Sequence, residues 1–129
     1  MKRLLFVDDD RHVLEGLRRL LRSRRHEWDM VFATSGSDAL VALEQQPAHV
    51  VVSDLRMPGM DGGELMRAVQ ERWPETVRIV LSGQADKADL GAVLPVVHEF
   101  LHKPCDPEVL EAALDNAVSR ADERDEARS

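Results

Sequence analysis

Residues 49–62 read His-Val-Val-Val-Ser-Asp-Leu-Arg-Met-Pro-Gly-Met-Asp-Gly. The run from 49 to 53 is almost continuously apolar, which is typical of a strand covered on both faces of a parallel sheet. Asp54 follows directly, and the Pro and Gly residues after it predict a shaped loop before the next helix. Such a loop can present a backbone carbonyl, that of Arg56, beside the Asp54 carboxylate. This stretch therefore predicts a strand that ends on a carboxylate, followed by a loop and a helix.

The same order of strand and helix recurs along the chain. Further apolar runs occupy residues 4–7, 30–33 (or 28–33), 77–81 and 99–101. Helical spacing or capping residues mark residues 13–21, 35–43, 65–73, 87–94 and 107–117. The fourth of these helices is the weakest, because Gly91 and Pro95 oppose helix formation. The alternation predicts an α/β fold with a doubly wound, five-stranded parallel sheet and helices on both faces.

Composition excludes several classes of protein. The chain has 129 residues, one cysteine and a net charge of −7, and no apolar run approaches the roughly 20 residues of a membrane span. One cysteine cannot form an internal disulfide, and the first residues show no signal-peptide pattern. An acidic chain is also a poor direct partner for nucleic acid, whose phosphates attract Lys and Arg. We expect a cytoplasmic protein with no membrane or direct nucleic-acid partner, one domain over residues 1–120, and a charged helix end or linker over residues 121–129.

Polar groups follow four of the five predicted strands. They are Asp8, Asp9 and Asp10 after the first strand, Asp54 after the third, Ser82 and Gly83 after the fourth, and Lys103 after the fifth. Ligands of open parallel sheets bind beyond the carboxyl ends of the strands, so these groups are expected to converge. Clustered carboxylates repel one another, and they either acquire raised pKa values or bind a cation. Mg²⁺ is the hard ion that an oxygen-only site suits.

Each group also has a plainer interpretation. Asp10 is expected to cap the first helix, a role that needs only one carboxylate. Lys103 offers a point charge for a transferred phosphoryl oxygen, or it forms a surface salt bridge. Ser82 and Gly83 offer a hydroxyl and a backbone N–H for an oxyanion, or they form only a turn. The convergence of all these groups at one edge, rather than any one of them, carries the functional interpretation.

Taken together, these segments resemble the receiver domain of two-component response regulators over residues 2–120. Residues 6–10 resemble the family's acidic metal-binding stretch, and residues 52–62 resemble its phosphoacceptor segment. Residues 81–83 resemble the switch hydroxyl and the small residue after it, with Ser in place of the commoner Thr. Residues 100–104 resemble the aromatic switch position, the lysine and a proline after a cis bond. The resemblance implies a flavodoxin-like (βα)5 fold with strand order 2-1-3-4-5.

The resemblance also implies a role for each residue. Asp54 would take a phosphoryl group from the phosphohistidine of a sensor histidine kinase or phosphotransfer protein, forming an aspartyl phosphate. Mg²⁺ (or Mn²⁺) would be held by a ligand set made of Asp8, Asp9, Asp54 and the backbone carbonyl of Arg56. The phosphoryl oxygens would meet a second set made of Lys103, the Ser82 hydroxyl and the Gly83 N–H.

Ser82 and Phe100 are the implied switch, which would change the face made by the fourth helix, fifth strand and fifth helix. Phe100 has no phenol oxygen, so it can respond by packing alone. The chain would catalyse its own phosphorylation and dephosphorylation, but it would act mainly as a signalling switch for an output domain or partner. Residues 79–86 and 100–106 resemble receivers attached to HD-type or related output domains.

Basic residues gather near the start of the chain. Residues 1–30 carry eight Lys and Arg against six Asp and Glu. The excess comes from Arg18, Arg19, Arg22, Arg24 and Arg25. A solvated helix face is one interpretation and a docking surface is another. The first and last helices of the resembled fold lie side by side, so we expect Arg18, Arg19 and Arg22 to pair partly with the acidic last helix and partly with a kinase.

Two other functions compete with a phosphorylated receiver. A haloacid-dehalogenase-like phosphatase would use Asp8 as its nucleophile, with Asp8-x-Asp10 as a faint match and His12 where Thr or Val is usual. An interaction module with a receiver fold and no phosphorylation would have a degraded set of strand-end groups, whereas every expected group is present here. The aspartate that becomes phosphorylated, Asp8 or Asp54, separates these alternatives.

Overall fold

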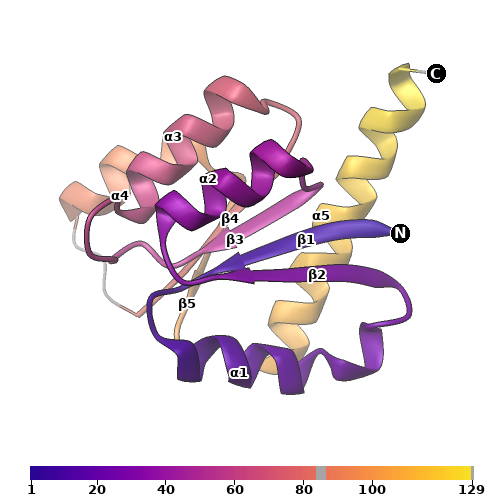
Figure 1. Ribbon diagram of the computed structural model, residues 1–129, viewed down its shortest axis with the longest axis horizontal. Helices are drawn as coiled ribbons and strands as arrows, with labels where there is room; N and C mark the ends of the chain where they lie inside the picture. The colour runs from indigo at the N-terminus through magenta and orange to yellow at the C-terminus, as the bar shows by residue number, and fades with distance from the viewer. Residues whose placement is uncertain (84–86, 129) are drawn as a thin grey trace.

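The computed structural model describes residues 1–83 and 87–128 (Figure 1). Residues 84–86, part of one segment that resembles HD-linked receivers, lie outside the described residues. Over the described part of the chain, the strands are β1 (Lys2–Val7), β2 (Trp28–Ala33), β3 (Val50–Ser53), β4 (Val77–Ser82) and β5 (Glu99–His102). The α-helices are α1 (Arg11–Leu20), α2 (Gly36–Gln45), α3 (Gly62–Arg72), α4 (Lys87–Val93) and α5 (Pro107–Arg128). Two short 3₁₀ helices, η1 (Arg22–Arg24) and η2 (Leu94–Val96), were not predicted.

The strands form one parallel sheet in the order β2-β1-β3-β4-β5. This order reverses direction at β1, so the loops after β1 and β3 leave the sheet toward opposite faces and leave a crevice between them. The predicted doubly wound fold and its strand order 2-1-3-4-5 are confirmed. Among the described residues, no helix is both long enough and apolar enough to cross a membrane.

The helices cover both faces of the sheet, with α1 and α5 on one side and α2, α3 and α4 on the other (Figure 1). One core contains Leu14 of α1, Leu114 of α5 and Phe6 of β1. The other contains Leu43 of α2 and Leu5 of β1. Leu5 and Phe6 are consecutive and almost completely buried, because successive strand side chains point to opposite faces. A strand covered on both faces is therefore apolar without interruption, as the sequence pattern predicted.

Side-chain caps set where several of the helices begin, among them α1, α2 and α3. The carboxylate of Asp10 accepts a hydrogen bond of 2.9 Å from the His12 N–H at the start of α1. At the start of α3, Asp61 and Glu64 form a capping box, in which each side chain accepts from the other residue's backbone N–H. The predicted capping role of Asp10 is confirmed, and Asp10 is thereby separated in function from the two aspartates before it.

α5 extends beyond the segment that its apolar spacing predicted, and the charged residues after position 120 continue it as helix. Its far end is fastened to the rest of the domain at two points. Arg124 Nη1 donates to the Glu75 carbonyl oxygen at 2.6 Å, and Asp122 Oδ1 lies 2.7 Å from Lys2 Nζ. Of the two forms expected for residues 121–129, a helix end or a linker, the described part is helix.

Arg18, Arg19 and Arg22 do not pair with α5 as expected. Arg24, in η1, is the arginine that meets α5, with Nη1 3.2 Å from Glu111 Oε1. Arg18 instead places its guanidinium 4.3 Å from the centre of the Phe32 ring, on the β2 side of α1. Among the described residues, no ion pair joins Arg18, Arg19 or Arg22 to α5. For the described residues the expected pairing is wrong, and Arg24 makes the contact instead, from a 3₁₀ turn after α1 that the helical spacing did not indicate.

A histidine lies among arginines at the amino ends of the strands. His98 precedes β5, and its Nδ1 accepts a hydrogen bond of 2.9 Å from the Arg78 backbone N–H. Burial, followed by the positive charges of Arg78, Arg120 and Arg124, lowers the pKa of His98 to about 4. The folded domain therefore holds this imidazole neutral under mildly acidic conditions.

His98 is expected to make the domain less stable as the pH falls from about 6.5 to 4. In this window the unfolded chain binds a proton at His98 and the folded domain does not, so protons favour unfolding. With allowance for partial solvent screening, the free energy of unfolding should fall by about 1–2 kcal/mol between pH 7 and pH 5. Urea unfolding of His98→Asn, which keeps an acceptor for the Arg78 N–H, should show a shallower pH dependence than the wild type. His26→Asn, at an exposed position, is the control, and equal slopes in all three proteins would contradict the prediction.

Candidate functional site

The register of the sheet brings the predicted strand-end groups to one edge. Val7 of β1 pairs with Ser53 of β3, so Asp8 and Asp54 leave adjacent strands at the same level. The backbone N–H of Asp54 donates to the Val7 carbonyl oxygen at 2.9 Å, which extends the ladder by one residue. The carboxylate of Asp54 is thus held by sheet geometry rather than by a free loop.

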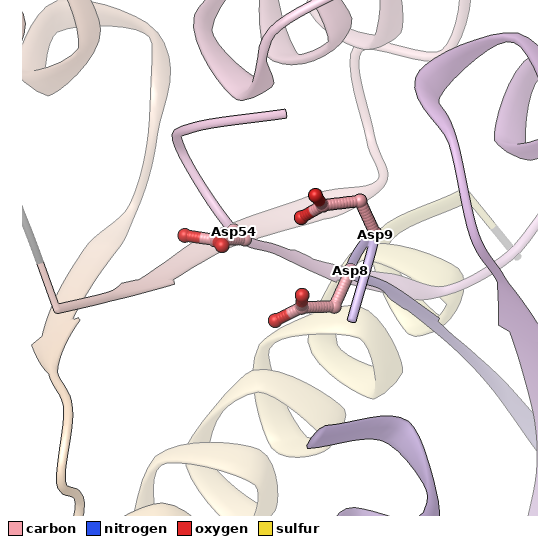
Figure 2. Close-up of side chains that lie close together, drawn as sticks. All are labelled: Asp8, Asp9 and Asp54. Atoms are coloured by element: carbon pink, nitrogen blue, oxygen red, sulfur yellow. The ribbon is translucent and has the colours of Figure 1, made fainter. Parts of the chain in front are cut away.

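Three carboxylates gather at this edge (Figure 2). Oxygen atoms of Asp8, Asp9 and Asp54, one from each residue, all lie within 4.8 Å of one another. Asp8 is buried with 3% of its surface exposed, Asp54 is half-buried and Asp9 is exposed. We call this group the acidic cluster. Asp8 lies on the buried side of the cluster and Asp9 on the exposed side, so the cluster is open to solvent beside Asp9.

Lys103 is the cation that faces the acidic cluster. Its Nζ lies 2.7 Å from Asp8 Oδ2 and 3.5 Å from Asp54 Oδ2. The Lys103 N–H donates to the Ser82 carbonyl oxygen at 3.0 Å, and the bond from Lys103 to Pro104 is cis, as the resemblance implied. The ammonium group therefore bridges the ends of β1 and β3 from the end of β5.

Burial and charge act in opposite directions on Lys103 and on Asp8. Burial disfavours the ammonium of Lys103, but its hydrogen bond to Asp8 and the charges of Asp54 and Asp8 outweigh burial and raise its pKa. Burial raises the pKa of Asp8, and the hydrogen bond from Lys103 offsets this only in part. With all these groups ionised, three carboxylates against one ammonium leave a net charge of −2. The acidic cluster is only partly neutralised by the protein itself.

The two oxygens of Asp54 have different surroundings. Oδ1 accepts a hydrogen bond of 2.7 Å from the Leu55 backbone N–H. Oδ2 faces Lys103 at 3.5 Å, a long contact. The backbone thereby fixes the rotation of the carboxylate and leaves Oδ2 as the oxygen less engaged by donors.

Ser82 is the last residue of β4 and Gly83 follows it, next to the backbone of Lys103. Ser82 is buried with 1% exposure, whereas Gly83 is exposed. A Cβ added to Gly83 would lie 3.5 Å from the Lys103 Cβ, an ordinary contact, so the space does not itself require glycine there. The structure brings both residues to the edge that carries the acidic cluster.

Phe100 and Arg56 lie at the borders of the site. Phe100, in β5, is half-buried against the core that contains α3 and α4, and its ring centre lies 5.0 Å from that of His102. Arg56 lies in the loop after Asp54, and its exposed side chain forms an ion pair with Asp89 of α4. No pattern in the sequence indicates that ion pair.

Gly62 is a second residue that sequence reasoning missed. Its N–H donates to the Leu55 carbonyl oxygen at 2.8 Å, and this bond closes the loop after β3. A Cβ at this position would overlap the Asp54 carbonyl oxygen and lie 2.8 Å from the Leu55 Cα. The start of α3 therefore packs directly on the backbone of the residue at the centre of the site. The position of Gly62 in a Pro- and Gly-rich loop indicates a turn, but it does not indicate this close approach to the backbone of Asp54.

The residues of the acidic cluster fit a divalent metal ion. Carboxylate and carbonyl oxygens are the ligands that Mg²⁺ and Mn²⁺ prefer, and no Cys or His belongs to the group. The net charge of −2 is the amount that one divalent cation balances. Asp8, Asp9 and Asp54 can therefore hold such an ion beside Lys103.

Known proteins resemble this chain in sequence. The family model for the response regulator receiver domain matches residues 4–115. The hydrogenase transcriptional regulatory protein HoxA of Cupriavidus necator is 37% identical over 117 residues, which are 89% of this chain and 24% of that protein. The transcriptional regulatory protein GlrR of Escherichia coli is 35% identical over 119 residues, which are 92% of this chain and 26% of that protein. The chain spans about a quarter of the length of these curated relatives.

A solved structure resembles it in fold. The signal receiver domain of an HD domain-containing protein from Pseudomonas fluorescens superposes with a TM-score of 0.90 at 27% sequence identity. The match covers 95% of this chain and 98% of that one. Phosphorylation, Mg²⁺ binding and exchange with histidine kinases or phosphotransfer proteins are features of this family. Sequence, fold and the strand-end groups together identify the chain as a member of the response regulator receiver domain family.

Proposed function

We propose that Asp54 accepts a phosphoryl group and that Lys103, Ser82 and Gly83 bind its oxygens. The observation that carries this proposal is the acidic cluster, in which Lys103 bridges Asp8 and Asp54 and leaves a net charge of −2. A site built for structure alone would pair its charges. The unbalanced negative charge of this site can attract a cation, and the bound cation together with Lys103 can then attract an anion.

In the reaction, an oxygen of Asp54 attacks the phosphorus of a phosphohistidine on a kinase or phosphotransfer protein. The new P–O bond forms as the P–N bond breaks, and the electron pair of that bond returns to the imidazole nitrogen of the donor. The hydrogen bond from the Leu55 N–H holds the carboxylate in one rotation during the attack. Lys103 then shares its ammonium with a phosphoryl oxygen, while the Ser82 hydroxyl and the Gly83 N–H donate to the others.

The proposed metal ligands are Asp8, Asp9, Asp54 and the backbone carbonyl of Arg56. Bound there, Mg²⁺ or Mn²⁺ would offset the negative charge that gathers on the phosphoryl oxygens. Asp8, buried and with a raised pKa, is the ligand that a proton would contest first. The chain itself supplies the groups for its phosphorylation and for later hydrolysis. A small phosphodonor should therefore phosphorylate it without a kinase.

The proposed switch is Ser82 with Phe100. Phe100 is half-buried beside α3 and α4, so it has room to become more or less buried when Ser82 engages the phosphoryl group.

We further propose that residues 1–120 form the receiver and 121–129 the connection to an output domain or partner. The likeness to a receiver of an HD domain-containing protein favours an HD-type output. The transcriptional regulatory relatives favour an output that acts on transcription. The net charge of −7 favours a receiver that does not itself bind nucleic acid. We expect this exchange to take place in the cytoplasm.

The test of the proposed function is incubation of the chain with acetyl phosphate and Mg²⁺. We expect the intact mass to rise by one phosphoryl group and the modified peptide to contain Asp54. A chelator added beforehand should prevent the gain, because the partly neutralised carboxylates would repel the donor. A gain on Asp8 with continuous release of phosphate would favour a phosphatase, and no gain would favour an interaction module.

A further inference from the structure

An ion pair joins the loop after the acidic cluster to α4. Arg56 follows Asp54 by two residues, and its guanidinium pairs with the carboxylate of Asp89. Both side chains line a hollow of about 490 Å³ bounded by the loop, α3 and α4. The side chain of Arg56 is 54% exposed and that of Asp89 30% exposed. The pair therefore spans a solvent-filled gap rather than reinforcing a packed interface.

α4 is a short helix that packs through few buried side chains. It contains seven residues, which is short for a helix that must be stable by itself. Gly91 lies in its interior and costs helix stability. Within residues 88–93, whose side chains the structure describes, Val93 alone is buried. A single ion pair can therefore supply a substantial part of the attachment of its first turns.

We propose that the Arg56–Asp89 ion pair is a latch that couples the acidic cluster to the position of α4, with Asp89 as a positioning residue. The coupling rests on the proposed function, since it assigns the Arg56 carbonyl to the metal ligands. The carbonyl and the guanidinium belong to one residue, so a shift that carries the carbonyl toward the cluster also moves the guanidinium relative to Asp89. A phosphoryl group on Asp54, with a charge near −2, also competes with the single charge of Asp89 for that guanidinium.

Coupling of this kind is reciprocal. If filling the site weakens the latch, then breaking the latch must favour filling of the site by the same factor. Exposed ion pairs contribute up to about 1 kcal/mol, and a contribution of about 0.4–1 kcal/mol corresponds to a change of about two- to five-fold. Asp89→Asn removes the charge and keeps the shape, so it isolates this contribution.

The first measurement concerns α4 alone, without metal or phosphodonor. In amide hydrogen exchange, Asp89→Asn should speed exchange across residues 87–93 by about two- to five-fold, and Asp89→Glu should keep most of the protection. Glu71→Gln on α3 is the matched control, because it also removes one exposed carboxylate and Glu71 has no ion pair within the described part of the chain. Equal exchange in Asp89→Asn and Glu71→Gln would overturn the latch.

The second measurement concerns coupling to the site. Titration with beryllofluoride, a phosphoryl mimic, in the presence of Mg²⁺ should give a dissociation constant about two- to five-fold lower for Asp89→Asn than for the wild type. In an Arg56→Met background, the effect of Asp89→Asn on exchange and affinity should be smaller than in the wild type by the contribution of this pair. An undiminished effect in that background would overturn the proposal. If the wild type binds no beryllofluoride, the proposed function fails and with it the coupling, while the exchange experiment still decides whether the ion pair holds α4.

Discussion

Asp54→Asn is expected to abolish the phosphoryl gain from acetyl phosphate and Mg²⁺ completely. The substitution keeps the size of the side chain and an oxygen that can accept the Leu55 N–H, so the fold and the loop after β3 should persist. It removes the anionic oxygen that attacks phosphorus, and an amide cannot form the acyl phosphate. It also removes one of the three negative charges that the acidic cluster offers to a cation. Intact-mass spectrometry over a time course measures the result directly.

Asp9→Asn is the matched control for this prediction. Asp9 is exposed and belongs to the acidic cluster, but it is not the proposed acceptor. Its loss should slow the gain on the order of ten-fold or more by weakening metal binding, yet the final mass should still rise by one phosphoryl group. A phosphorylated Asp54→Asn protein, or a complete block in Asp9→Asn with normal modification of Asp54→Asn, would mean that the acceptor lies elsewhere.

Gly62→Ala is expected to destabilise the domain by about 2–4 kcal/mol, although it adds a single methyl group. The new Cβ would overlap the Asp54 carbonyl oxygen and crowd the Leu55 Cα, and backbone atoms cannot rotate away as a flexible side chain can. Either the start of α3 must move or the end of β3 must move. Protein that remains folded should also accept phosphoryl groups more slowly, because the displaced backbone carries the Asp54 carboxylate.

Gly16→Ala provides the opposite case with the same chemistry. Gly16 lies in the interior of α1, and a Cβ there would have no atom within 4 Å beyond its own neighbourhood in the helix. Alanine should stabilise the domain by about 0.5–1 kcal/mol through helix propensity. Urea unfolding followed by the fluorescence of Trp28 and Trp73 compares the two variants. If both substitutions changed the free energy of unfolding in the same direction, the close approach at Gly62 would not be the cause.

Much of the fold was predictable because its signals are local. Residues 4–7 of β1 and 50–52 of β3 are continuously apolar since both faces are covered, and Asp10 could be recognised as a cap from its place before a helical pattern. The convergence of Asp8, Asp54 and Lys103 also followed, because parallel strands end at one edge. Sequence could not show that Lys103 lies closer to Asp8 than to Asp54, which depends on rotamers and burial around residues 95 positions apart.

The features that were missed depend on contacts between distant segments or on backbone packing. Arg56 and Asp89 are 33 residues apart, and neither has a spacing or neighbour that indicates the other. Arg24 could not be distinguished from Arg18 by charge, because the direction of each side chain follows from the turn at η1. The crowding at Gly62 depends on how closely the first residue of α3 packs on the backbone after β3. The spacing of apolar residues in the sequence indicates none of these contacts.

The fastenings of α5 have a mechanical consequence. At 1.5 Å per residue its 22 residues span about 33 Å, longer than the sheet it covers. It is joined to η1 through Asp115, its ninth residue, and to the loop before β4 through Arg124 near its end. Nine residues separate the two attachments, about 13 Å along the helix axis. A rigid helix held at two separated points cannot pivot about either one, so α5 resists tilting relative to the sheet.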